Sequence, residues 1–67
     1  MKISYKPLFR QLFERDMGKM DLLRAANLST TTLSKLGKNQ PVKLEMLMKI
    51  CTVLHCRIED VVEFVEE

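Results

Sequence analysis

The sequence predicts a compact all-α domain, and its composition, apolar spacing and turn residues are the basis for that prediction. The chain has 67 residues, of which 46% are hydrophobic, with only two glycines and two prolines. This length fits a single domain over residues 1–67, and such a composition favours helices over sheets. Apolar residues recur at three- and four-residue intervals between short turns. We therefore expect five helices at about residues 7–16, 19–26, 30–36, 44–55 and 59–65.

The first expected helix begins near Pro7, because proline lacks only an N–H that has no partner in the first helical turn. Its apolar side would consist of Leu8, Phe9, Leu12 and Phe13. The preceding residues 1–6 alternate weakly between polar and apolar. They could form an extended arm, or a short strand that pairs with a second chain.

The second and third expected helices are separated by a short turn with clear stop and start residues. Gly18 precedes the helix over 19–26, whose apolar residues are Leu22, Leu23 and Ala26. Asn27 tolerates the left-handed conformation that ends helices, and Ser29 is a good N-cap for the next one. In that next helix, Leu33 and Leu36 would point inward and leave the hydroxyl-bearing side exposed.

The last two expected helices follow a loop over residues 37–41. The apolar face of the helix over 44–55 would contain Leu44, Leu47, Met48, Cys51 and Leu54, with Ile50 beside it. This helix is therefore expected to be central. The fifth helix would present Val61, Val62 and Val65, with Phe64 near the edge. Two acids, Glu59 and Asp60, suit the positive N-terminal end of that helix.

Charge is unevenly distributed although the formal net charge is only +2. Residues 19–43 contain five lysines and arginines against one acid, a net +4. Residues 57–67 contain one arginine against five acids, a net −4. A basic middle and an acidic end indicate one surface that meets a polyanion and another that is directed away from it.

Several other classes of function are not supported by the sequence. Cys51 and Cys56 are too close together for a disulfide framework, and with His55 they are poorly placed for tetrahedral zinc. We interpret them as small apolar residues of an intracellular protein. No signal peptide or membrane-spanning segment is evident, so we expect a cytoplasmic protein. No nucleophile–base constellation or phosphate-binding glycine loop occurs, so we expect neither catalysis nor a cofactor.

Two short helices joined by a tight turn fit the physics of a helix-turn-helix unit. The first helix of such a unit braces against the DNA backbone, and the second lies in the major groove, which is wide enough for one helix. The groove-facing side has to be polar and the opposite side apolar. The segment 30–36 satisfies this, since Thr30, Thr31, Ser34 and Lys35 oppose Leu33 and Leu36.

The same residues resemble a known family. The pattern Leu22-Leu23-x-x-x-Asn27-Leu28-Ser29-x-x-x-Leu33-Ser34-x-Leu36 looks like the core motif of the phage repressor and Cro (Xre-type) family. The segments 42–51 and 54–61 are similar to the family's fourth helix and to the entry of its fifth, so the resemblance covers about residues 7–65. It implies a five-helix repressor-like fold that binds duplex DNA in the major groove.

Roles of individual residues follow from this resemblance alone. It implies that the residues reaching base edges are Thr30, Thr31 and Lys35. It implies that those contacting the DNA backbone are Lys19, Thr32, Ser34, Lys38, Asn39 and Lys43. Lysine can donate to guanine, which makes Lys35 the best candidate for direct readout. Lysine contacts to phosphate add affinity and carry no sequence information.

Two hypotheses of different classes follow. The first is a transcriptional regulator, with repression as its expected mode, that binds DNA as a homodimer and has no small-molecule effector. Its dimer contacts would come from Met1–Tyr5, the fifth helix, or both. The alternative is a protein-interaction module, such as an antitoxin or adaptor, that uses the same helices to hold another protein.

Overall fold

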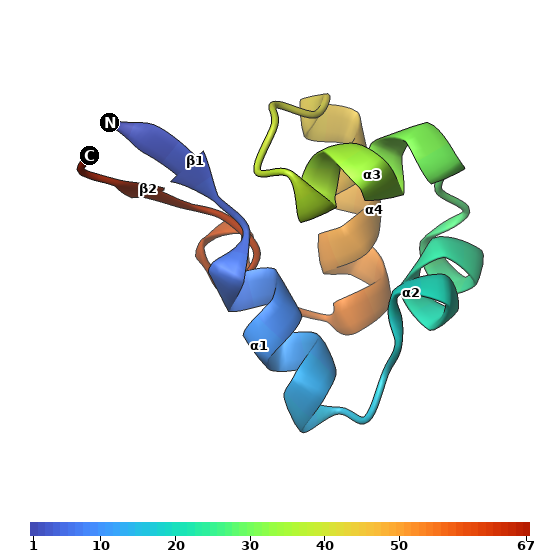
Figure 1. Ribbon diagram of the computed structural model, residues 1–67. Coiled ribbons are helices and arrows are strands. Elements are labelled where there is room, and N and C mark those ends of the chain that lie inside the picture. Colours follow the sequence, from blue (N-terminus) through green and yellow to red (C-terminus); the bar gives the residue numbers. More distant parts are fainter.

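A computed structural model describes all residues, 1–67, and shows four α-helices and a small sheet (Figure 1). The elements in chain order are β1 (Lys2–Ser4), α1 (Lys6–Glu14), α2 (Lys19–Ala26), α3 (Thr30–Gly37), α4 (Leu44–Leu54), the 3-10 turn η1 (Ile58–Asp60) and β2 (Glu63–Val65). The first four expected helices are present, and their ends agree with the sequence-based bounds to within two residues.

The core forms where α4 packs against α2 and where η1 closes over α1 and α4. The buried apolar residues are Tyr5, Leu8, Leu12, Leu22, Ala26, Leu28, Leu36, Leu47, Ile50, Leu54 and Val61. The expected inner face of α4 is partly wrong, because Leu44 is 70% exposed and Met48 is 63% exposed. Leu47 and Leu54 are buried as expected, together with Ile50 beside that face. Both sets have helical spacing, so periodicity alone did not distinguish them.

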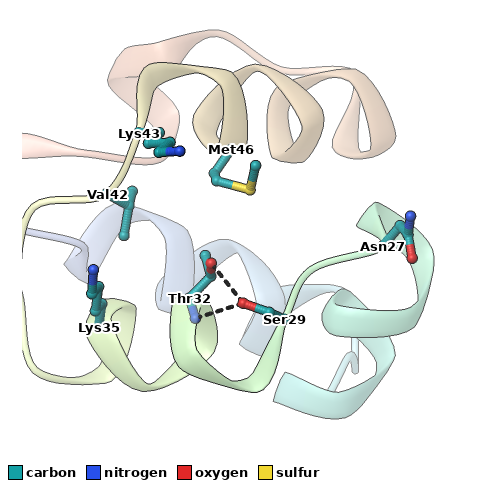
Figure 2. A pocket seen from close by; sticks show the side chains of 7 residues that line it. All are labelled: Asn27, Ser29, Thr32, Lys35, Val42, Lys43 and Met46. Carbon is teal, nitrogen blue, oxygen red and sulfur yellow. Dashed lines mark hydrogen bonds between the residues drawn. The ribbon is translucent and has the colours of Figure 1, made fainter.

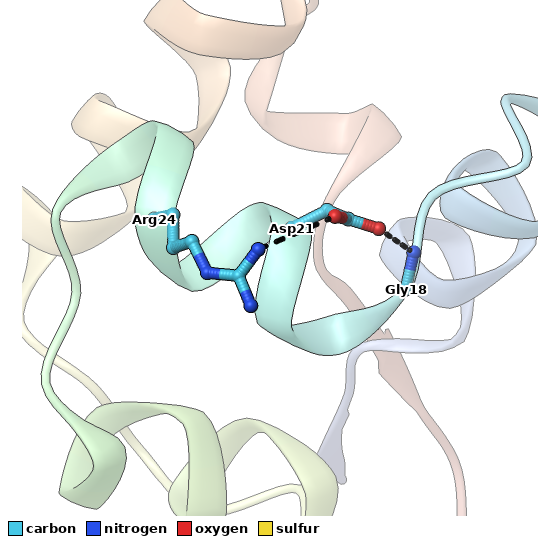
Figure 3. A network of polar contacts seen from close by, with 3 residues as sticks. All are labelled: Gly18, Asp21 and Arg24. Carbon is cyan, nitrogen blue, oxygen red and sulfur yellow. Dashed lines mark hydrogen bonds and ion pairs between the residues drawn. The ribbon is translucent and has the colours of Figure 1, made fainter.

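Local residues set the ends of the helices, and Asn27 does so as expected. Asn27 ends α2 with a φ of 54°, and His55 ends α4 with a φ of 52°, both in the left-handed region. At the start of α2, the Asp21 carboxylate accepts a hydrogen bond of 2.8 Å from the Gly18 N–H (Figure 3). This bond satisfies an N–H near the helix end that would otherwise lack a partner.

The expected fifth helix over residues 59–65 is wrong. Only η1 is helical there, with the Asp60 carboxylate accepting from the Arg57 N–H at 3.1 Å. The chain then becomes the strand β2. Val62, Phe64 and Val65 are β-branched or aromatic residues that favour strands, and β1 supplies a partner for them. The protein therefore combines four helices with a two-stranded sheet.

The expected N-terminal arm is a strand that pairs within its own chain. β1 and β2 are antiparallel, with Lys2 opposite Val65, Ile3 opposite Phe64 and Ser4 opposite Glu63. The two chain ends therefore lie together, and they extend away from the helices (Figure 1). No other strand joins this sheet, so each strand keeps one unpaired edge.

Tyr5 connects the N-terminal end of α1 to the loop that follows α3. Its ring is buried, its N–H donates to the Asn39 side-chain oxygen at 3.0 Å, and its hydroxyl donates to the Gln40 carbonyl at 2.8 Å. Burial raises the pKa of the Tyr5 hydroxyl, and a hydrogen bond with the backbone of Val42 partly offsets this rise in pKa. These contacts fix the loop over residues 38–41 to the body of the protein.

The two cysteines are free thiols at the end of α4. The Cys56 N–H donates to the Cys51 carbonyl at 3.1 Å, which closes the helix end. Both side chains are half-buried and pack against the core, in agreement with their interpretation as small apolar residues. Burial raises the pKa of the Cys51 thiol, and the neighbouring Cys56 raises it further.

None of the helices has the length and hydropathy that crossing a membrane requires.

Candidate nucleic-acid interface

The outer side of α3 is open to solvent and carries hydroxyls and an amine. Thr30, Thr31, Ser34 and Lys35 are exposed, whereas Leu36 on the opposite side is fully buried. The sequence predicted this division from the spacing of Leu33 and Leu36. Leu33 itself is half-buried, at the margin between the two sides. The polar side of α3 is therefore free to meet a partner.

The start of α3 is fixed by Ser29, as the sequence predicted. The Ser29 hydroxyl accepts from the Thr32 N–H at 3.1 Å, and it lies 3.0 Å from the Thr32 hydroxyl. Thr32 is half-buried and is turned toward α4 rather than outward. Its hydroxyl is therefore already engaged within the protein, unlike those of Thr30 and Thr31.

A hollow of about 290 Å³ lies between α3 and the start of α4 (Figure 2). The residues that line it are Asn27, Ser29, Thr32, Lys35, Val42, Lys43 and Met46. It contains two ammonium groups, from Lys35 and Lys43, and no carboxylate, so it attracts anions. Asn27 and Ser29 line this hollow but were not among the predicted contact residues. Their place in the turn before α3 was the signal that could have identified them.

The segment from Thr30 to Lys43 carries three lysines and no acid. None of these lysines forms a salt bridge, since the only salt bridge in the protein joins Arg24 to Asp21 at 4.0 Å (Figure 3). Lys38 and Asn39 are both exposed in the loop after α3. The Asn39 side-chain oxygen accepts from Tyr5, which leaves its NH₂ group as a free hydrogen-bond donor.

Comparison with known proteins identifies the family. A sequence profile of the Cro/C1-type HTH DNA-binding domain matches residues 8–67. The chain belongs to the Cro/C1-type helix-turn-helix family. The crystal structure (Form II) of the transcriptional regulator VanUg is similar, with a TM-score of 0.94 and 41% sequence identity over 98% of this chain and 88% of that one. No curated protein sequence gives a significant match.

In this Cro/C1-type domain, α2 and α3 are the helix-turn-helix pair, and the turn between them is residues 27–29. Lys19 begins α2, and its ammonium group lies 5.4 Å from the centre of the Phe9 ring on α1. It does not line the hollow with Lys35 and Lys43. The structure therefore gathers most of the predicted contact residues around α3, while Lys19 stands apart.

Several acids of the Cro/C1-type domain gather away from the hollow beside α3. Glu14, Glu59, Asp60 and Glu63 surround a separate hollow between α1 and η1, together with Arg10. No lysine lines that hollow. Lys38 and Asn39 share a further hollow with Glu63 and Glu66 near the sheet. Lys35 and Lys43 line a hollow that contains no acid, which favours a positive potential there.

Proposed function

We propose that this protein is a transcriptional regulator that inserts α3 into the major groove of duplex DNA and acts chiefly as a repressor. The observation that supports it is the open polar side of α3 beside a hollow with two lysines and no acid. In this proposal Thr30, Thr31 and Lys35 reach base edges. Lysine donates to guanine acceptors, and threonine offers a hydroxyl and a methyl group that packs against thymine.

The proposed backbone contacts surround that helix. Ser34 and Lys38 are exposed near the base-reading residues, and Lys43 lines the same hollow as Lys35. Thr32 and Asn39 would contact the DNA through the capacity that their internal hydrogen bonds leave free. Lys19 would exchange its contact with Phe9 for a phosphate. Such contacts supply affinity through counterion release.

We further propose that the protein binds as a homodimer and acts through binding rather than catalysis, without a small-molecule effector. A single domain of this size covers too little DNA for tight specific binding, and two half-sites one helical turn apart overcome this. Access to chromosomal DNA requires a site inside the cell, so a cytoplasmic location is part of the proposal.

The test begins with selection of binding sites from random duplexes, followed by titration of the selected duplex at several salt concentrations. We expect Lys35→Ala to weaken binding by about 5- to 150-fold, equivalent to about 1–3 kcal/mol, and to relax specificity at one base pair. Lys43→Ala should weaken all sequences similarly and reduce the salt slope by about one. Arg10→Ala, which removes the same charge beside the acids, is the matched control and should change neither.

Two results would contradict the proposal. One is DNA binding that is absent or insensitive to salt. The other is a loss of affinity in Arg10→Ala as large as that in Lys43→Ala. Absent DNA binding combined with tight binding of a purified protein partner would favour the antitoxin or adaptor hypothesis instead.

A further inference from the structure

The two edges of the small sheet differ in charge. The outer edge of β2 belongs to a segment with Glu63, Glu66 and Glu67, and charged residues of this kind protect an edge from pairing with another chain. The outer edge of β1 carries one charge, Lys2. The Tyr5 N–H donates to Asn39 and not to β2, so it points toward this outer edge. Because N–H directions repeat every second residue, the Ile3 N–H points the same way.

We propose that a second copy of this chain pairs through β1, antiparallel and centred on Ile3, to give a continuous four-stranded sheet. This inference assigns the dimer surface of the homodimer proposed above. A sheet of two three-residue strands is marginal by itself, and the new pairing would extend it to four strands. It leaves the glutamate-bearing β2 strands at the two outer edges, where pairing with further copies is disfavoured.

The register follows from charge and from the existing hydrogen bonds. Opposite residues of an antiparallel pair point to the same side of the sheet. To keep the apolar Ile3 side chains of both copies on one side, odd-numbered residues have to lie opposite odd-numbered ones. Centring on Lys2 would place two ammonium groups directly opposite each other. Centring on Ser4 would place the partner's Ile3 opposite Tyr5, whose N–H is already bonded to Asn39, whereas centring on Ile3 leaves only the partner's terminal Met1 there. Ile3 is the remaining centre.

This register forms a continuous apolar row on one side of the sheet. Ile3 lies opposite Phe64 within the chain, and Phe64 is 68% exposed. Across the two-fold axis, Ile3 would meet the partner's Ile3, so four apolar side chains would stand side by side. An adjacent hollow of about 470 Å³, lined by Met1, Ile3, Pro41 and Phe64 among others, would receive the partner's Met1.

The opposite side of the sheet has complementary charges in the same register. Lys2 would lie opposite the partner's Ser4, whose own cross-strand neighbour is the partner's Glu63. A lysine side chain can extend over a serine, so each Lys2 can reach the partner's Glu63. The two-fold axis is perpendicular to the sheet, so both copies of α3 lie on the same side of the dimer. This arrangement is required if both helices are to enter the major groove from one side of a duplex.

Disulfide cross-linking without DNA tests the register. In Ile3→Cys the two introduced cysteines would be about 5.5 Å apart between Cα atoms, within disulfide range. We expect Ile3→Cys to form a covalent dimer in oxidised glutathione. Lys2→Cys should cross-link far more slowly, and the parent protein, which has only Cys51 and Cys56, should not cross-link. Faster cross-linking of Lys2→Cys, or none in Ile3→Cys, would overturn the register.

Sedimentation at increasing protein concentration tests the surface independently. The strands bury little area, so the free dimer should be weak. Phe64→Ser should raise its dissociation constant by at least about tenfold. Phe13→Ser, which alters a phenylalanine on α1 that is 84% exposed, should leave the dissociation constant unchanged. A protein that stays monomeric throughout, or a dimer insensitive to Phe64→Ser, would overturn the assignment even if DNA binding is confirmed.

Discussion

Replacing Tyr5 by phenylalanine tests how one hydroxyl holds the loop beside α3. The ring is fully buried and would keep its packing, so the change removes the hydroxyl alone, with its 2.8 Å hydrogen bond to the Gln40 carbonyl and its contact with the backbone of Val42. A hydrogen bond of this kind contributes about 0.5–1.5 kcal/mol net. Gln40 is exposed, so water can reach the freed carbonyl. We therefore expect a loss of about 1 kcal/mol in the free energy of unfolding, or a fall of about 4–8 °C in Tm.

Urea unfolding followed by circular dichroism measures this loss as a lower midpoint at constant slope. Thr52→Val is the matched control, because it deletes a hydroxyl that donates to the Met48 carbonyl at the same 2.8 Å on the exposed side of α4. That variant should cost little. The reasoning would be refuted if Tyr5→Phe unfolded at the midpoint of the parent protein, or if Thr52→Val were equally destabilising.

Three further predictions follow from contacts described above. The pKa of the Tyr5 hydroxyl is raised above its ordinary value of 10.0, so the folded state keeps this proton to a higher pH than the unfolded state does. The free energy of unfolding should therefore be at its full value below about pH 10 and fall as the pH rises through the folded-state pKa. Tyr5→Phe should abolish this pH dependence, and phenolate absorbance can follow the titration in the parent protein. Gly37 ends α3 without a positive φ, and an added Cβ would meet no atom within 4 Å. Gly37→Ala should therefore stabilise the protein by about 0.4–1 kcal/mol, measured by thermal unfolding. A lower Tm in this variant would show that the added methyl group is not accommodated. The Arg15 guanidinium donates to the Leu54 carbonyl at 2.7 Å and so lies at the negative end of α4. Arg15→Met should lower the free energy of unfolding in urea by about 1 kcal/mol, and by less at high salt concentration. If the variant is as stable as the parent protein at low salt, the contact contributes nothing.

The helices around the candidate site could be predicted because their signals are local. Asn27 ends α2 and Ser29 begins α3 through contacts within three or four residues. The exposed side of α3 followed from the spacing of its two leucines. By contrast, the engagement of Asn39 by Tyr5 could not be predicted, because it joins residues 34 positions apart that no local pattern connects.

The C-terminal segment shows where periodicity misleads. Val61, Val62 and Val65 fit helical spacing, yet only Val61 is buried and the residues after it form β2. Their strand preference was visible in the sequence, but a strand needs a partner, and that partner lies at the other end of the chain. The same dependence explains why Met1–Tyr5 could not be assigned to an arm or to a strand from its own residues.

The pairing of the two chain ends also bears on how the molecule folds. Every other element contacts neighbours that are closer along the chain, whereas β1 and β2 can meet only after nearly the whole polypeptide has been arranged between them. Closing so long a loop carries the largest entropic cost, and the two strands that it joins have only three residues each. The sheet should therefore form after the helices and open before them, and the backbone amides of β2 should exchange with deuterium well ahead of those in α4.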